Sequence, residues 1–300
     1  MLARGGRVRR LVDFTNEIDP IELAEPDVLT VLKLIWHSIA SFFAERPGQI
    51  IGSAFFLLML WGAHGNLELL GLALPGWRGP GAPPAERPQL IPGVPWDHEL
   101  ISFWGGAFFV VLVPVLLIRF VYRQPLADYG LGLPPPGRRA LALWTFLTLT
   151  LLSLPGFWLG SQDASMRQVY PFFRAFSGPL DFLLYELTYL PFFVAIEFIF
   201  RGYLLFGLAG AVDGDVRLPG RRGVPGPLFF GRYALLLQML SYTAWHLGKP
   251  LPELWGTLIW GLAAGATAYA ARSIWPVVAA HWLLNVFLDG AILLTGGAAR

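Results

Sequence analysis

Long runs of apolar residues alternate with short polar stretches along most of this 300-residue chain. Several runs have about 20 residues, which is enough for an α-helix to cross a bilayer. The runs that predict membrane spans are residues 50–74, 100–121, 141–159, 180–208, 229–247, 254–271 and 274–294. The pattern therefore predicts an all-α fold, a polytopic membrane bundle of about seven transmembrane helices.

Polar and helix-breaking residues mark the ends of several segments. Residues 28–44 mix apolar side chains with Lys33 and His37, which favours a helix at the membrane interface or a poor first span. The sequence ERPG at 45–48 is expected to break the chain after that helix, and Pro191 is expected to divide the long run 180–208. Residues 75–97 are rich in Pro and Gly and predict an external loop.

The composition agrees with a membrane protein. Hydrophobic residues make up 55% of the chain and charged residues only 14%, whereas about a quarter of a soluble domain is charged. There is no cysteine, which excludes disulfides, thiol catalysis and cysteine-ligated metals. The net charge is +2, and the basic residues lie mostly between the apolar runs. We interpret them as signals of membrane topology and expect no nucleic-acid partner.

The basic clusters also predict an orientation and a domain organisation. They lie within residues 4–10, 119–139 and 217–222 and alternate with less basic connections. This distribution predicts a multi-pass protein of the cell membrane (plasma or inner) with its N-terminus in the cytoplasm. The basic N-terminus lacks the short apolar core of a secretory signal. We expect a cytoplasmic or interfacial segment at 1–48, accessory transmembrane helices at 49–178 and a functional core at 179–300.

Two charged residues interrupt the apolar stretch AIEFIFRGYL at 195–204. A charge at the bilayer centre costs about 2.5–3.5 kcal/mol, so such a side chain faces the protein interior and is a candidate for function. Glu197 and Arg201 are four residues apart and share one helix face. Two interpretations stay open: an internal ion pair that allows both to be buried, and one wall of a polar site.

Two further apolar segments carry histidines with polar neighbours one helical turn away. His246 ends the segment SYTAWH and follows Tyr242 by four residues, and His281 precedes Asn285 by four residues in HWLLN. A single buried histidine is usually structural. Two of them on successive apolar helices, together with Glu197, favour a polar cluster in the membrane.

Such a cluster supports two kinds of chemistry. A neutral imidazole and a carboxylate can take a proton from water, while a second imidazole and a carboxamide stabilise an oxyanion. Alternatively, Glu197, His246 and His281 could hold a divalent metal such as zinc with an open position. No HExxH zinc helix and no GxSxG serine motif occurs. We favour the reaction without a cofactor.

These segments resemble a known family. The order E-x-x-x-R-G, an aromatic residue four before a histidine, and SIWPVVAAH-x-x-x-N is similar to the motifs of the CPBP intramembrane proteases. That family includes the CAAX prenyl endopeptidases of the Rce1 type and the bacterial Abi proteins. The resemblance extends from near Pro179 to Val286, and the first 130 residues have no part in it.

The resemblance implies roles for individual residues. His246 and a motif glutamate would activate water, and His281 and Asn285 would stabilise the oxyanion. Tyr242 replaces the usual phenylalanine. The family motif is Glu-Glu-x-x-x-Arg, and its first glutamate, to which water activation is assigned, falls on Ile196. Glu197 is rotated about 100° around the helix from that position.

The expected function is therefore hydrolysis of a peptide bond in a membrane-associated protein or peptide, with lipids as surroundings. His246 would be the general base, with Glu197 assisting and Arg201 neutralising Glu197. The alternative is a pseudoprotease that keeps the polar cavity to bind a partner, as a scaffold or an immunity factor. A small-molecule or ion pathway is a third possibility, less favoured because no inverted repeat is found.

Overall fold

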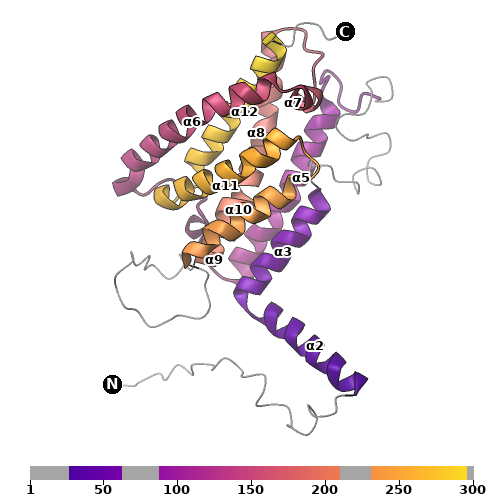
Figure 1. Ribbon diagram of the computed structural model, residues 1–300, viewed down its shortest axis with the longest axis vertical. Coiled ribbons are helices and arrows are strands. Elements are labelled where there is room, and N and C mark those ends of the chain that lie inside the picture. Colours follow the sequence, from indigo (N-terminus) through magenta and orange to yellow (C-terminus); the bar gives the residue numbers. More distant parts are fainter. Residues whose placement is uncertain (1–26, 63–87, 210–230, 296–300) are drawn as a thin grey trace. The chain divides into compact units, whose positions relative to one another are not determined.

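The computed structural model describes residues 27–62, 88–209 and 231–295 (Figure 1). These residues are almost entirely helical and contain no strand, so the predicted all-α fold is confirmed. The chain forms two compact units, residues 1–49 and 50–300. The basic clusters at 4–10 and 217–222 and most of the Pro-rich loop lie outside the described residues.

The helix α2, Val28–Ala44, coincides with the predicted interfacial segment. Its N-cap is Asp27, whose side chain accepts a hydrogen bond from the Thr30 N–H at 2.7 Å. The helix ends at Glu45, where the backbone is extended. The break predicted at ERPG is present at Glu45 and is one residue long, because α3 (Arg46–Trp61) begins at the next residue. A proline is tolerated in a first helical turn, where its missing N–H has no intrahelical partner.

The unit 50–300 contains most of α3 and the remaining helices. Their bounds are α5 (Asp97–Leu116), α6 (Arg139–Gln162), α7 (Ala164–Val169), α8 (Pro179–Glu197), α9 (Gly207–Ala209), α10 (Ala234–Trp245), α11 (Leu251–Ala271) and α12 (Trp275–Thr295). Two π-helical segments, Leu117–Val121 and Phe198–Phe206, continue α5 and α8. The unit is thus a bundle made mostly of long helices.

Within the described residues, four helical stretches are long and apolar enough to cross a membrane, or five if α2 and α3 form one broken span. The four are Asp97–Val121, Pro136–Gln162, Pro179–Ala209 and Trp275–Thr295. The predicted count of seven is not confirmed. The segment at 229–247 forms a helix of only 12 residues, which is shorter than the hydrocarbon core of a bilayer. The structure is that of a multi-pass membrane protein.

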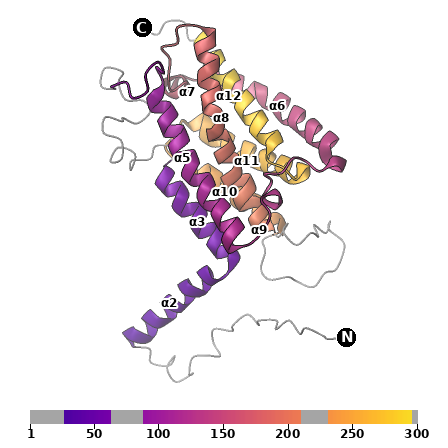
Figure 2. The same ribbon diagram turned by 180° about the vertical axis from the view of Figure 1, so that it is seen from behind.

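The longest of these stretches, Pro179–Ala209, is also the most buried. Of its apolar window 89% is buried, against 11% for Pro136–Gln162. Figures 1 and 2 show why: α8 lies in the middle of the bundle, between α5 and α12. The prediction that Pro191 divides this run is wrong, because α8 continues through it. The change in helix type comes seven residues later, at Phe198.

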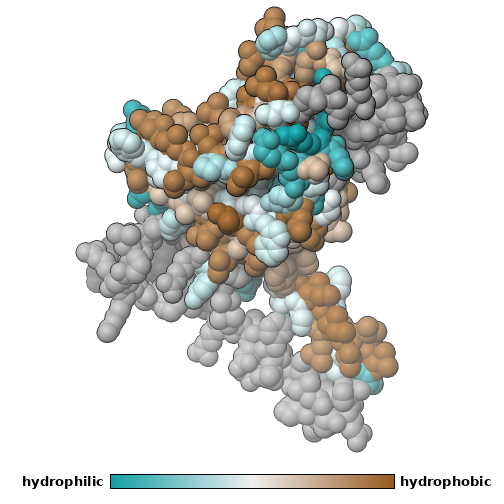
Figure 3. Space-filling view, turned by 45° about the horizontal axis from the view of Figure 1, so that its top comes forward, coloured by the Kyte–Doolittle hydropathy of each residue, from teal (hydrophilic) through white to brown (hydrophobic). Residues whose placement is uncertain are grey.

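Apolar side chains cover much of the outer surface. Figure 3 shows hydrophobic residues spread over the face that it presents. On α6 the exposed large side chains include Trp144, Leu151 and Leu152, the last 77% exposed. A soluble protein rarely exposes a continuous apolar area of this kind. Lipid contact on the outside explains the pattern.

Close helix packing depends on glycines at several contacts. Gly261 and Gly265 on α11 face α10, where an added Cβ would come within 3.0 Å of Met239 and 2.5 Å of Gln238. Small residues four positions apart thus allow α11 to pack closely against α10. The tightest contact joins α5 to α3. A Cβ on Gly106 would lie 1.6 Å from Nε1 of Trp61, which is completely buried.

We therefore expect Gly106→Ala to destabilise the protein by about 1–3 kcal/mol, because the buried indole cannot move away without disturbing its neighbours. The measurement is thermal unfolding of the purified protein in detergent. Gly156→Ala is the matched control, since Gly156 also lies within a helix but has no atom within 4 Å of the added carbon. Equal unfolding temperatures for the two variants would contradict the packing of α5 against α3.

Candidate active site

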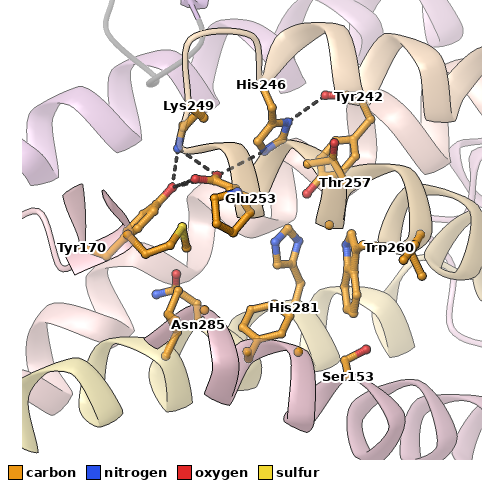
Figure 4. Close-up of a pocket in the computed structure, with 18 of the residues that line it drawn as sticks. Ser153, Tyr170, Tyr242, His246, Lys249, Glu253, Thr257, Trp260, His281 and Asn285 are labelled. Atoms are coloured by element: carbon orange, nitrogen blue, oxygen red, sulfur yellow. Dashed lines mark hydrogen bonds and ion pairs between the residues drawn. The ribbon is translucent and has the colours of Figure 1, made fainter. Parts of the chain in front are cut away.

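A cavity of about 620 Å³ lies among α6, α8, α10, α11 and α12. Its wall is largely apolar, with Phe157, Phe192 and Trp260 among its lining residues. The polar side chains that line it include His246, Lys249, Glu253, Thr257, His281 and Asn285. Figure 4 shows most of them facing one another across the same space. The sequence prediction placed His246, His281 and Asn285 in one site, and all three line this cavity.

His246 reaches the cavity because α10 is short and ends just before it. The residue is the C-cap of α10 and only 5% exposed. Its Nδ1 lies 2.7 Å from the carbonyl oxygen of Tyr242, which can only accept a hydrogen bond. Nδ1 therefore carries the hydrogen, and Nε2 is the atom left to act as a base. The Tyr242 ring contacts the imidazole edge-on, with ring centroids 4.4 Å apart.

His281 enters the same space from α12 and is held by Glu197. Its Nδ1 lies 2.6 Å from Oε1 of Glu197, and its side chain is 13% exposed. Figure 4 shows the ring pointing toward the region beneath His246 and Glu253. Because the carboxylate accepts at Nδ1, the other ring nitrogen can donate to a ligand only when the ring carries both protons.

Glu197 and Arg201 form the buried ion pair that their spacing predicts. Nη1 of Arg201 lies 3.3 Å from both carboxylate oxygens of Glu197, and neither side chain is exposed. The guanidinium carbon also lies 4.2 Å from the centre of the Tyr242 ring. Glu197 is the last residue of α8 and Arg201 belongs to the π-helical segment, a helix type that is common at functional sites.

Glu197 does not belong to the cavity wall, whereas its neighbour Ile196 does. The motif resemblance equates position 196 with the family's water-activating glutamate. Glu197 faces His281 and Arg201 instead. The 100° rotation between neighbouring helical positions thus decides which of the two side chains meets the cavity.

Asn285 lines the cavity one turn after His281. Its amide nitrogen lies 3.2 Å from Oε2 of Glu186 and 3.3 Å from Oδ2 of Asp289. In this arrangement its N–H bonds go to two buried carboxylates. Donation to a ligand oxygen requires one of these long bonds to be exchanged.

Two carboxylates of the wall are absent from the sequence prediction. Asp163 caps the N-terminus of α7, and Glu253, in the first turn of α11, lies near His246. Its Oε1 lies 3.7 Å from Nε2 of His246 and 3.2 Å from Nζ of Lys249. Tyr170 donates to the same carboxylate, with oxygen distances of 2.8 and 2.9 Å. Burial and the charge of Glu253 raise the pKa of the Tyr170 hydroxyl well above its ordinary value, so that this group stays a donor. The only sequence signal for Glu253 is its distance of seven residues from His246.

The described residues contain no group of three or more His, Asp, Glu or Cys side chains that could hold a metal ion. The three residues considered as possible zinc ligands, Glu197, His246 and His281, do not form such a group. Glu197 does not line the cavity. The cavity therefore offers a pair of imidazoles and a carboxylate rather than a ligand shell. Such groups can transfer protons and donate hydrogen bonds.

Comparison with known proteins agrees with the site. Residues 179–287 match the family model described as type II CAAX prenyl endopeptidase Rce1-like. No curated protein and no solved structure matches the chain. The matched region contains Glu197, His246, His281 and Asn285. The resemblance drawn from the motifs is thereby confirmed for residues 179–287, which are similar to Rce1-like CAAX proteases.

Proposed function

We propose that the protein hydrolyses a peptide bond of a membrane-associated protein or peptide with a water molecule activated by His246. The observation that carries this proposal is that His246 and His281, from different helices, face one largely apolar cavity. The apolar wall suits a lipid-modified or transmembrane substrate. A prenylated peptide that ends in a CAAX sequence is the probe suggested by the family description.

The proposed reaction uses the contacts described above. Nε2 of His246 takes a proton from water, and the hydroxide attacks the carbonyl carbon. The oxyanion is held by Nε2–H of His281, and then by Asn285 when it exchanges a hydrogen bond. When the C–N bond breaks, His246 returns its proton to the leaving amine. Such acid–base catalysis contributes about 10²–10⁴ in rate.

In this scheme Glu197 acts through His281. The carboxylate accepts a hydrogen bond from Nδ1–H of the ring and so fixes the orientation of the ring, while Arg201 is the ion-pair partner of Glu197. The sequence prediction gave Glu197 a part in water activation next to His246. We assign it to the oxyanion side, because its closest partner is His281 and it does not line the cavity. The scheme uses no cofactor.

Cleavage by the purified protein tests the proposal. A farnesylated, internally quenched peptide is incubated with the protein in lipid nanodiscs, and the products are identified by mass spectrometry. We expect cleavage near the C-terminus and incorporation of one oxygen from labelled water into the new carboxylate. The assay is repeated with a chelator, and loss of activity would assign a metal. If neither this probe nor membrane proteins from expressing cells are cleaved, the proteolytic function is contradicted.

A non-catalytic binding role is the second candidate, and one observation favours it. Ile196 occupies the wall position of the motif glutamate and has no polar atom in its side chain. The variant Ile196→Glu distinguishes the two. A silent wild type that gains cleavage through this substitution would be a pseudoprotease. A wild type that already cleaves the probe would exclude that role.

The expected location belongs to the same proposal. A substrate that is embedded in the membrane requires the cavity to open within or beside the bilayer. We place the protein in the cell membrane with its N-terminus in the cytoplasm, because four arginines gather at the adjoining ends of two spans and between them: Arg119, Arg123, Arg138 and Arg139. Protease accessibility of an N-terminal tag in sealed vesicles tests this orientation.

A further inference from the structure

We propose that Glu253 is the carboxylate that works with His246 in this protein, in place of the motif glutamate that Ile196 has replaced. This inference rests on the proposed peptide hydrolysis and goes beyond the family match, which assigns nothing to position 253. Two features of the cavity wall suggest this replacement. Ile196 lies at the position that the motif resemblance equates with an acid, and Glu253 brings an acid to the wall from another helix.

The position of Glu253 satisfies the geometry of this role. Its Oε1 lies 3.7 Å from Nε2 of His246, the nitrogen that is free to act as base. Both side chains line the cavity and are nearly buried, 16% and 6% exposed. Figure 4 shows the carboxylate beside the imidazole, with His281 below both. A water molecule in the cavity can therefore contact Nε2 while the carboxylate faces the ring.

Its surroundings keep Glu253 ionised and fixed. Lys249 lies one turn before it with Nζ at 3.2 Å, and the hydroxyl of Tyr170 donates to it. Lys249 also donates to Tyr170 at 2.5 Å, so that the three groups restrain one another. A carboxylate can accept about four hydrogen bonds, which leaves room for a further donor such as His246 or water.

A simpler role exists for an acidic residue in a first helical turn, because it interacts favourably with the helix dipole. That role requires neither burial nor contact with a histidine. Glu253 has both, and it has them in the cavity that contains the proposed base. The dipole therefore explains why an acid is compatible with this turn but not why it faces His246.

The chemical step follows from the charge. When Nε2 of His246 accepts a proton from water, the ring becomes a cation. Glu253 stabilises this cation, and the interaction is strong because the site is largely shielded from water. Glu253 therefore acts through His246 as a positioning residue, and the proton is returned from Nε2 to the leaving amine. The step needs no reactant other than water and the peptide substrate.

The central test is Glu253→Gln, assayed for cleavage of the farnesylated peptide. We expect kcat to fall by about tenfold or more with little change in KM, because the transition state loses the stabilised imidazolium. Glu253→Asp should restore part of the rate. Glu45→Gln makes the same change at an exposed residue that does not line the cavity, and it should leave kcat unchanged.

The pH profile separates this role from a merely structural one. The titratable or charged groups that face His246 are Glu253 and Lys249 on one side, Tyr242 of its own helix and His281 of α12. Removing the negative charge makes protonation of His246 less favourable. The acid limb of the kcat profile in Glu253→Gln should therefore move to lower pH, whereas Lys249→Met should move it to higher pH.

A rescue experiment makes the outcomes distinct. We expect Ile196→Glu combined with Glu253→Gln to recover activity, since it returns an acid to the wall. If wild type and this double variant are both inactive, the proposed hydrolysis fails. If wild type is active and Glu253→Gln has its rate and pH profile unchanged, only the present inference fails. Glu253→Gln could fold poorly because Lys249 loses its partner. The double variant Lys249→Met with Glu253→Gln avoids this by removing both charges. Full cleavage activity of that double variant would also overturn the inference about Glu253.

Discussion

His246→Ala is expected to abolish cleavage while the protein still folds. The substitution removes the imidazole nitrogen that takes the proton from water in the proposed scheme, so the rate should fall by about 10²–10⁴. The structural loss is smaller, because His246 lies at a helix end and its Nδ1 bonds to a backbone carbonyl. The measurement pairs the peptide-cleavage rate with thermal unfolding of the same preparation.

The controls for this prediction use other histidines. His37→Ala changes an exposed histidine of α2 that does not line the cavity, and its rate should equal that of wild type. His281→Ala should also be inactive, because it removes the principal donor to the oxyanion. If cleavage, or a phenotype in cells, survives both His246→Ala and His281→Ala, the catalytic interpretation is wrong.

The placement of the two histidines shows what can be deduced from a sequence of this kind. His246 and His281 stand out because imidazoles are rare in apolar helices and each has a polar neighbour one turn away. Periodicity within one helix also predicted the contact of Glu197 with Arg201, which the structure contains. These are local relations, and the period of an α-helix determines them.

Relations between helices were harder to deduce. Nothing in the sequence near Glu197 says that its carboxylate faces His281, which lies 84 positions further on. That contact depends on how α8 and α12 are rotated in the bundle. Glu253 was missed for the same reason: an acid in a first helical turn has an ordinary explanation, and only the tertiary arrangement brings it to His246.

Helix ends and helix types were also predicted incorrectly where packing overrides local preference. Pro191 was expected to break its helix, yet α8 passes through it in the most buried part of the bundle. Neighbouring helices can satisfy the backbone group that a proline leaves free. The span at 229–247 contains a helix that ends before His246, and this shortness brings His246 into the cavity.

Arg201→Met should have the largest effect on stability, because it leaves the carboxylate of Glu197 buried beside His281 alone. Both members of the pair are completely buried. Removing one partner of a buried ion pair costs about 3–5 kcal/mol, mainly because the remaining charge is uncompensated. The unfolding free energy in detergent measures this cost. Arg138→Met is the control, since Arg138 is exposed and donates to a backbone carbonyl.

A double-variant cycle separates the ion pair from simple loss of packing. Glu197→Gln with Arg201→Met removes both charges, so it should be more stable than Arg201→Met alone although it changes one more residue. The same double variant should still lose cleavage activity, because His281 no longer has the carboxylate that holds its ring in place. An Arg201→Met protein as stable as wild type would contradict the stabilising role of the buried Glu197–Arg201 pair.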